Sequence, residues 1–137
     1  EDPGFGLKIP DNIKFILLLI ANENIPTNLF RFNRHVSFDF LCRSCNSSEE
    51  SIVHMLRDCP KVVGVWSALR LDFSHHQGDM NIADWLHSHA SSDCGLLFMI
   101  ACWIIWKSRN KEIIQNASTN TRIVLHQIHN LFDDVSR

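Results

Sequence analysis

The sequence predicts a mainly α-helical protein with little sheet. Apolar residues recur at helical spacing, and residues 62–69 show the i, i+3, i+4, i+7 pattern of one buried helix face. Two longer apolar runs, 15–21 and 95–106, are expected to be buried helices, because crossing a membrane takes about 20 apolar residues. Proline and short polar residues stand where several of these helices would begin.

Composition and charge place the chain among ordinary globular domains. It has 137 residues, of which 45% are apolar and 20% charged, and this excludes wholesale disorder, collagen-like repeats and a large multidomain enzyme. The net charge of −2 excludes a polybasic chain, so any contact with nucleic acid requires a local patch. Five cysteines, an odd number, argue against a secreted disulfide framework and favour a reducing compartment, where clustered thiols often bind metal.

The first half of the chain is expected to contain short helices and one extended segment. Asp11 is a plausible N-cap for a helix that runs to about residue 21, and Thr27 is a plausible N-cap for the next. Residues 36–41 alternate apolar and polar side chains, which is the period of a short strand. Pro60 stands at a favourable first-turn position of a further helix.

The second half is expected to be helical apart from a polar loop over 72–80. A short helix is predicted over 82–86. Ser91, Ser92 and Asp93 would cap a long helix over 94–115, and a last amphipathic helix follows over 121–135. If these two helices dock a neighbouring domain, the apolar face of the last helix would lack a partner within this chain.

The strongest chemical signal is a run of four metal-ligating side chains within 18 residues, spaced as Cys42-x2-Cys45-x8-His54-x4-Cys59. Zinc prefers four such ligands in a tetrahedron, and three cysteines with one histidine form a closed structural set. His54 would project from a short helix over about 50–57. We therefore predict one structural zinc ion that stabilises a small helical domain.

Three other interpretations of these cysteines are open. They could be free buried thiols, two of them could form a disulfide, or the zinc could be catalytic with an open coordination position. Cys94 and Cys102 lie eight residues apart on one predicted helix, too far apart to share a metal, and are expected to be small buried residues. With the zinc site placed, the chain divides into a zinc-binding domain over 1–72, a loop and short helix over 73–92, and a helical spacer over 93–137.

No catalytic residue can be assigned. A polymerase needs clustered carboxylates that hold two metal ions, and the paired acids at 1–2, 49–50 and 133–134 are expected to be solvated, or at 49–50 to serve a helix N-terminus. A glycine-rich phosphate loop and a nucleophile motif are absent as well. Metal-dependent hydrolysis by the zinc would need an open site, so we predict a protein that is not an enzyme by itself.

Two groups of cations are candidates for nucleic-acid binding. Phenylalanines interleave with the first group, so exposed rings could stack on bases while arginines contact phosphate. The alternative is that most of these rings belong to the core. The second group lies near the end of the long predicted helix, where cations also suit the helix dipole. The candidates are Arg31, Arg34, His35 and Arg43 in the first group, and Lys107, Arg109 and Lys111 in the second.

Several short motifs occur together in a specific order. They are Lys8-Ile9-Pro10, Ile25-Pro26-Thr27, Cys42-x2-Cys45, Glu49-Glu50, His54-Met55-Leu56, Cys59-Pro60, Val65-Trp66 and the stretch from Trp103 to Asn110. This combination, over about residues 5–116, resembles the zinc-binding domain of plant non-LTR retrotransposon reverse transcriptases with the helical spacer that follows it.

The resemblance implies a role within a longer chain. It implies that Cys42, Cys45, His54 and Cys59 are the zinc ligands, that reverse transcriptase and ribonuclease H domains are the neighbours, and that the domain binds or positions RNA or DNA. The alternative is a zinc-stabilised adapter that docks neighbouring domains. No signal peptide or transmembrane segment is evident in the sequence, so we expect an intracellular location, nuclear or cytoplasmic.

Overall fold

The computed structural model describes residues 9–71, 81–116 and 118–137, and it confirms the mainly α-helical prediction. The described residues form no named strand, and their only β-bridge pairs Leu41 with Glu49. The helices, in chain order, are α1 (Asp11–Ala21), α2 (Asn28–Asn33), η1 (His54–Asp58), α3 (Pro60–Ala68), α4 (Ile82–Ala90), α5 (Gly95–Gln115) and α6 (Thr121–Ser136).

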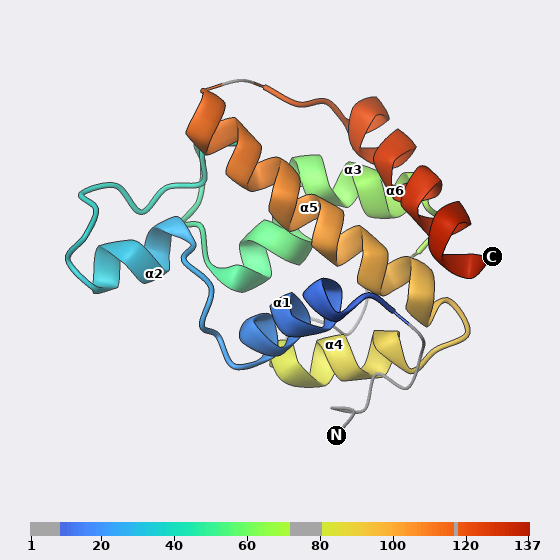
Figure 1. The fold of residues 1–137 in the computed structure, drawn as a ribbon. Coiled ribbons are helices and arrows are strands. Elements are labelled where there is room, and N and C mark those ends of the chain that lie inside the picture. Colours follow the sequence, from blue (N-terminus) through green and yellow to red (C-terminus); the bar gives the residue numbers. More distant parts are fainter. Residues whose placement is uncertain (1–8, 72–80, 117) are drawn as a thin grey trace.

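Helix α5 forms the centre of the molecule. It crosses the middle of Figure 1, with α1 and α4 on one side and α3 and α6 on the other. It packs against α1, α4, α6 and η1. Five consecutive residues, 98–102, are each at most 1% exposed, so this stretch is buried on all sides. That burial explains why the first half of this helix is apolar around its whole circumference.

Aromatic rings join α3, α4 and α5 in the core. The ring of Trp66 stacks on that of Phe98 with centroids 5.5 Å apart, and Trp85 meets the same Phe98 edge-on at 5.2 Å. The Trp66 indole N–H donates a hydrogen bond of 2.7 Å to the carbonyl of Leu56, which precedes α3. The zinc-ligand segment and the C-terminal helices therefore share one hydrophobic core.

The contact between α4 and α5 depends on Gly95. A Cβ atom at this position would lie 2.0 Å from the carbonyl oxygen of Ala90, a distance that no side chain tolerates. Glycine therefore allows α5 to begin directly against the end of α4. The predicted cap at residues 91–93 is wrong, because Cys94 occupies the N-cap position and makes no side-chain capping bond.

Helix α6 buries Val124 and Ile128 and packs on α5 and α3. The expectation that its apolar face lacks a partner is therefore wrong. The side chain of Asn120 caps the helix by accepting a hydrogen bond of 2.9 Å from the backbone N–H of Ile123. No described helix is long and apolar enough to span a membrane.

Several local predictions were tested by the structure. Thr27 caps α2, and Pro60 occupies the first turn of α3, as expected. The predicted cap at Asp11 is wrong, because α1 begins at Asp11 itself and Pro10 is its N-cap. Residues 36–41, expected to be a short strand or an extended segment, form no strand and have only the single bridge at Leu41. The predicted loop over 72–80 lies outside the described residues.

Candidate metal centre

The first two cysteines lie in a tight loop between α2 and η1. The backbone N–H of Asn46 donates to the carbonyl of Cys42 at 2.8 Å, and the N–H of Cys42 donates to the carbonyl of Ser48 at 2.7 Å. Asn46 adopts a left-handed backbone conformation, with φ of 54°, which asparagine tolerates better than most residues. These bonds turn the chain so that Cys42 and Cys45 face the same side.

The other two side chains come from η1, a single π-helical turn. The N–H of Cys59 donates to the carbonyl of His54 at 2.8 Å, which is the five-residue spacing of a π-helix. The predicted α-helix over 50–57 is thus a π turn at this point. Cys59 leaves the turn in an extended conformation and is the N-cap of α3. Short π-helical turns occur frequently at functional sites.

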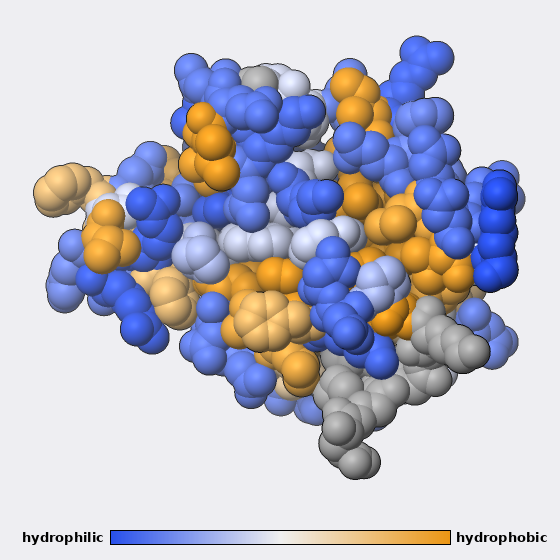
Figure 2. All heavy atoms as spheres, in the orientation of Figure 1, coloured by the Kyte–Doolittle hydropathy of each residue, from blue (hydrophilic) through white to orange (hydrophobic). Residues whose placement is uncertain are grey.

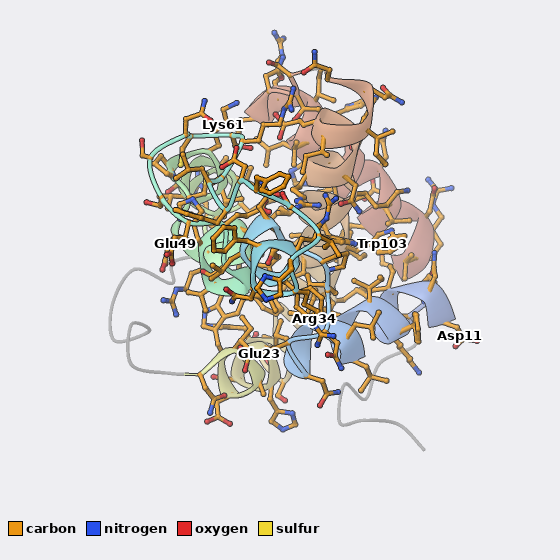
Figure 3. All side chains as sticks on the ribbon, turned by 90° about the vertical axis from the view of Figure 1, so that its left-hand side faces the viewer. Asp11, Glu23, Arg34, Glu49, Lys61 and Trp103 are labelled. Carbon is orange, nitrogen blue, oxygen red and sulfur yellow. The ribbon has the colours of Figure 1, made fainter. Side chains whose placement is uncertain are left out.

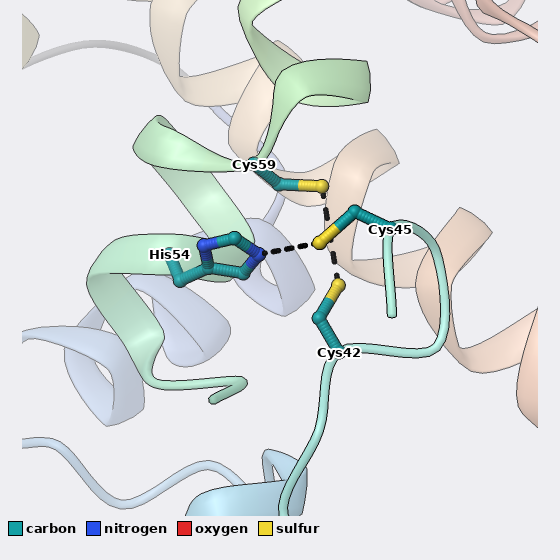
Figure 4. A group of neighbouring side chains, drawn as sticks. All are labelled: Cys42, Cys45, His54 and Cys59. Atoms are coloured by element: carbon teal, nitrogen blue, oxygen red, sulfur yellow. Dashed lines mark hydrogen bonds between the residues drawn. The ribbon is translucent and has the colours of Figure 1, made fainter. Parts of the chain in front are cut away.

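The four side chains converge on one point (Figure 4). One ligand atom from each of Cys42, Cys45, His54 and Cys59 lies within 4.8 Å of the other three. The sulfurs of Cys42 and Cys59 are 3.9 Å apart, and the sulfur of Cys45 is 3.4 Å from Nε2 of His54. A tetrahedral zinc ion would separate two thiolate sulfurs by ~3.8 Å and a sulfur from an imidazole nitrogen by ~3.5 Å. The donor set therefore fits one structural zinc ion.

The geometry bears on the other interpretations of these cysteines. A disulfide brings two sulfurs to about 2.05 Å, far closer than the 3.9 Å seen between Cys42 and Cys59, and both are free thiols. Four protein donors also fill the tetrahedron and leave no position for a catalytic water. Cys94 is exposed and Cys102 is fully buried, so the prediction of burial is right for Cys102 only.

A hydrogen bond between two of the cysteines lowers the pKa of one of them, Cys59. In the metal-free site, the hydrogen bond from Cys42 lowers the pKa of Cys59 to about 7, and the same bond together with burial raises the pKa of Cys42. About half of the Cys59 side chains are therefore thiolate near neutral pH, and the thiolate is the form that zinc binds.

A buried ion pair lies next to the candidate zinc site. Glu50 is 1% exposed, so the expectation of a solvated acid at this position is wrong. The guanidinium of Arg109, from α5, donates to both carboxylate oxygens of Glu50, at 2.6 and 2.9 Å. Its carbon also lies 4.9 Å from the ring centroid of Trp106. Arg109 is thus occupied within the fold, although the sequence made it a candidate for nucleic-acid binding.

Asn28 extends this ion pair to α2. Its backbone N–H donates to the Glu50 carboxylate at 2.7 Å, and its side-chain oxygen accepts from Arg109 at 3.2 Å. Its amide nitrogen donates to the carbonyl of Leu41 at 2.7 Å. Helix α2 buries none of its own residues, so these polar bonds are a main part of its attachment. The sequence analysis did not predict this network, because its three residues lie far apart in the chain and no local pattern joins them.

A second carboxylate, Glu112 of α5, ties the cysteine loop to the C-terminal helices. It accepts hydrogen bonds from the hydroxyl of Ser44 at 2.9 Å and from the backbone N–H of Thr119 at 3.3 Å. The ammonium of Lys61 lies 3.8 Å from it. A cavity of about 340 Å³ adjoins these groups and the two buried cysteines. The loop that carries the metal ligands is therefore fixed by side chains distant in sequence.

The first group of nucleic-acid candidates lies on one exposed side of the molecule. Arg34, His35 and Arg43 are exposed and Arg31 is half-buried. Figure 3 looks onto this side, with Arg34 facing the viewer. The expectation that most of the nearby phenylalanines are core residues is wrong, because none of the four is buried, and Phe38 is fully exposed, at 102%.

Of the second group of nucleic-acid candidates, two residues are exposed and the third, Arg109, is engaged in the buried ion pair. Lys107 and Lys111 are exposed on α5, and the ammonium of Lys107 lies 5.2 Å from the ring centroid of Trp103. Helix α5 continues to Gln115 and has no basic residue in its last turn, so these lysines are not placed to complement its dipole. Arg109 points instead to Glu50, as described above.

The fold and the donor set define a helical domain built around one structural zinc site. Residues 5–66 match the protein family described as zinc-binding in reverse transcriptase. This match and the four converging donors confirm the resemblance that the sequence motifs indicated.

A relative in the plant Arabidopsis thaliana, named as a putative ribonuclease H protein, extends the similarity. It is 28% identical over 127 aligned residues, which cover 85% of this chain and 20% of the relative. The chain therefore spans about one fifth of the length of this relative. No solved structure matches the chain.

Proposed function

We propose that this chain is a non-catalytic zinc module of a retroelement reverse-transcriptase polyprotein and that it binds nucleic acid. In this proposal Cys42, Cys45, His54 and Cys59 hold one structural zinc ion. The relative's name supports a neighbouring ribonuclease H domain, and the matched family supports a neighbouring reverse transcriptase. An intracellular site of action, nuclear or cytoplasmic, belongs to the same proposal.

One observation carries the nucleic-acid proposal. Residues 28–46 contain three arginines and a single acidic residue, although the whole chain has a net charge of −2. The same stretch holds the four phenylalanines that the fold leaves unburied. We call these side chains the aromatic–basic surface: Phe30, Arg31, Phe32, Arg34, His35, Phe38, Phe40 and Arg43.

This composition suits a nucleic-acid strand better than other ligands. Arginines attract phosphate, and aromatic rings stack on bases, so the two together fit a backbone and its bases at once. Exposed apolar side chains also mark the left edge of Figure 2, which is the side of α2 in Figure 1. Grouped apolar side chains in contact with water indicate a binding surface. In this proposal Lys107 and Lys111 make a second, weaker contact with the phosphates.

The adapter alternative is supported by one different observation. Helix α1 exposes Phe15 at 60% and Leu18 at 38%, so a neighbouring domain could cover them. The adapter alternative also expects an open apolar face on α6, but in the structure this helix buries Val124 and Ile128 against α5 and α3. The aromatic–basic surface therefore favours nucleic acid as the ligand.

A salt titration tests the proposal. Zinc-loaded protein would be titrated into a fluorescein-labelled RNA of mixed sequence between about 50 and 200 mM salt. We expect Arg31→Ala/Arg34→Ala to weaken binding and to lower the slope of log affinity against log salt by about 1.4, since each phosphate contact on a single strand contributes about 0.7. The matched control, Arg122→Ala/Arg137→Ala, removes the same charge elsewhere and should bind normally. Absence of binding at 50 mM salt would refute the proposal.

A further inference from the structure

We propose that the aromatic–basic surface takes an unpaired strand, with Phe38 as a stacking platform and the polar hollow beside it as the receptor for the edge of one base. This inference rests on the proposed function and names the class of nucleic acid. It is carried by the exposure of one ring, by the fixed loop that holds it, and by the chemistry of the hollow.

The ring of Phe38 is presented by an ordered loop. On either side of it, the N–H of Asp39 donates to the hydroxyl of Ser37 at 3.2 Å, and the N–H of Leu41 donates to the Asp39 carboxylate at 3.0 Å. Phe40 packs edge-on against Phe32 at 4.9 Å. These contacts fix the backbone on both sides of Phe38. The Phe38 ring itself is fully exposed, so both of its faces are open to a base.

The hollow beside Phe38 has the size and polarity of a nucleotide receptor. Its volume is about 450 Å³, which lies within the range of small-ligand sites, about 300–1,000 Å³. Its lining includes Ser37, Asp39, Arg43 and Asn46, with Ile113 of α5 as an apolar part of the wall. Ser37 and Asp39 flank Phe38 in the sequence, so the hollow is lined in part by the same loop that carries the ring.

The hydrogen-bonding groups in the hollow suit the edge of a base. Asp39 uses one carboxylate oxygen for the backbone of Leu41 and has acceptor capacity on the other. The side chains of Arg43 and Asn46 make no hydrogen bond to any described residue, so both can donate to a base. A carboxylate repels phosphate, so the backbone of the strand is expected on Arg31 and Arg34 instead.

Both contacts require an unpaired base. In a duplex, neighbouring bases cover the faces that Phe38 would stack on, and pairing occupies the Watson–Crick edge that the hollow would receive. A carboxylate accepts from the amino group of cytosine, whereas uracil offers a carbonyl at the same position. The surface should therefore prefer single strands, and cytosine-rich strands to uracil-rich ones.

The test compares three labelled RNAs with the zinc-loaded chain: a C-rich strand, a U-rich strand and a hairpin duplex. We expect the single strands to bind at least about tenfold more tightly than the duplex. Phe38→Ala should weaken single-strand binding by about 5- to 100-fold, the range seen for one stacked base, and leave duplex binding unchanged. Phe15→Ala removes an exposed phenyl group from α1 and is the matched control. Asp39→Asn should reduce the preference for the C-rich strand.

A strand that carries 2-aminopurine gives a direct readout of stacking. Its fluorescence should be quenched on binding to the wild-type chain and not to Phe38→Ala. Equal affinity for duplex and single strand, or an unchanged affinity of Phe38→Ala, would overturn this inference while the proposed function stands. Failure of all three RNAs to bind would refute both.

Discussion

Replacing Arg109 with methionine tests whether the Glu50–Arg109 pair supports the zinc-binding fold. Methionine keeps most of the aliphatic stem and removes the guanidinium, so Glu50 loses both hydrogen bonds from Arg109. The side chains are 10% and 2% exposed, so water cannot compensate the carboxylate well. Removing one partner of a buried ion pair typically costs about 3–5 kcal/mol. Since domains are stable by about 5–15 kcal/mol, the loss should be a large part of the total.

The assay is urea denaturation of the zinc-loaded protein, followed by circular dichroism. Lys107→Met is the control, because it removes a cation from the exposed face of the same helix and should change the free energy of unfolding by less than about 0.5 kcal/mol. The double variant Glu50→Gln/Arg109→Met removes the unpaired charge and should recover part of the loss. Its deviation from additivity measures the coupling between the two residues.

The salt dependence of the free energy of unfolding distinguishes a buried ion pair from an exposed one. Exposed charges are screened within about 10 Å at 0.1 M salt, whereas a buried pair is screened much less. The destabilisation of Arg109→Met should therefore persist at high salt. A stability within about 0.5 kcal/mol of the wild type would refute the reasoning, and so would a loss that disappears when salt is added.

Three further predictions concern the thiols, the metal and a half-buried histidine. Cys45→Ala, or chelation of the metal, should unfold the zinc-binding segment, because it removes folding free energy supplied by the ion; native circular dichroism and one retained zinc per chain would contradict this. After zinc removal, the unfolded segment should expose Cys59 to iodoacetamide, whereas Cys102, which is fully buried in α5, should react later, and bound zinc should protect Cys59. Mass spectrometry of the labelled peptides would measure this order. Burial lowers the pKa of His89, so the unfolded chain binds its proton more tightly and stability should fall as the pH drops through about 6.5 toward the lower folded value; His89→Gln should lose this part of the pH dependence in thermal unfolding.

The extent to which the sequence predicted the site depends on the distance between its parts. The four candidate ligands lie within 18 residues, so their spacing and chemistry are visible in the sequence alone. The Glu50–Arg109 pair joins residues 59 positions apart, and no local pattern reports such a contact. Glu49 and Glu50 look alike in the sequence, yet one is exposed and the other is buried. The division into domains at residue 72 stays a prediction.

The segment at 36–41 shows why a periodic pattern can mislead. Its alternation of apolar and polar residues is typical of a strand, but a strand needs a neighbour that takes up its backbone hydrogen bonds. Here Ser37 and Asp39 bond to the nearby backbone instead and hold the chain as a loop. The apolar members of the pattern then face solvent, which is why rings expected in the core lie at the surface.

The partner of Glu50 has a consequence for how this domain can be inherited and engineered. Similarity to the zinc-binding family ends at residue 66, while Arg109 comes from a helix that begins at Gly95. We expect a chimera that takes residues 5–66 from this chain and its downstream helices from elsewhere to fold poorly, unless the second parent supplies a guanidinium at the matching place. Recombination between related elements would be tolerated better at a junction before α1 or after α6 than at the edge of the family match.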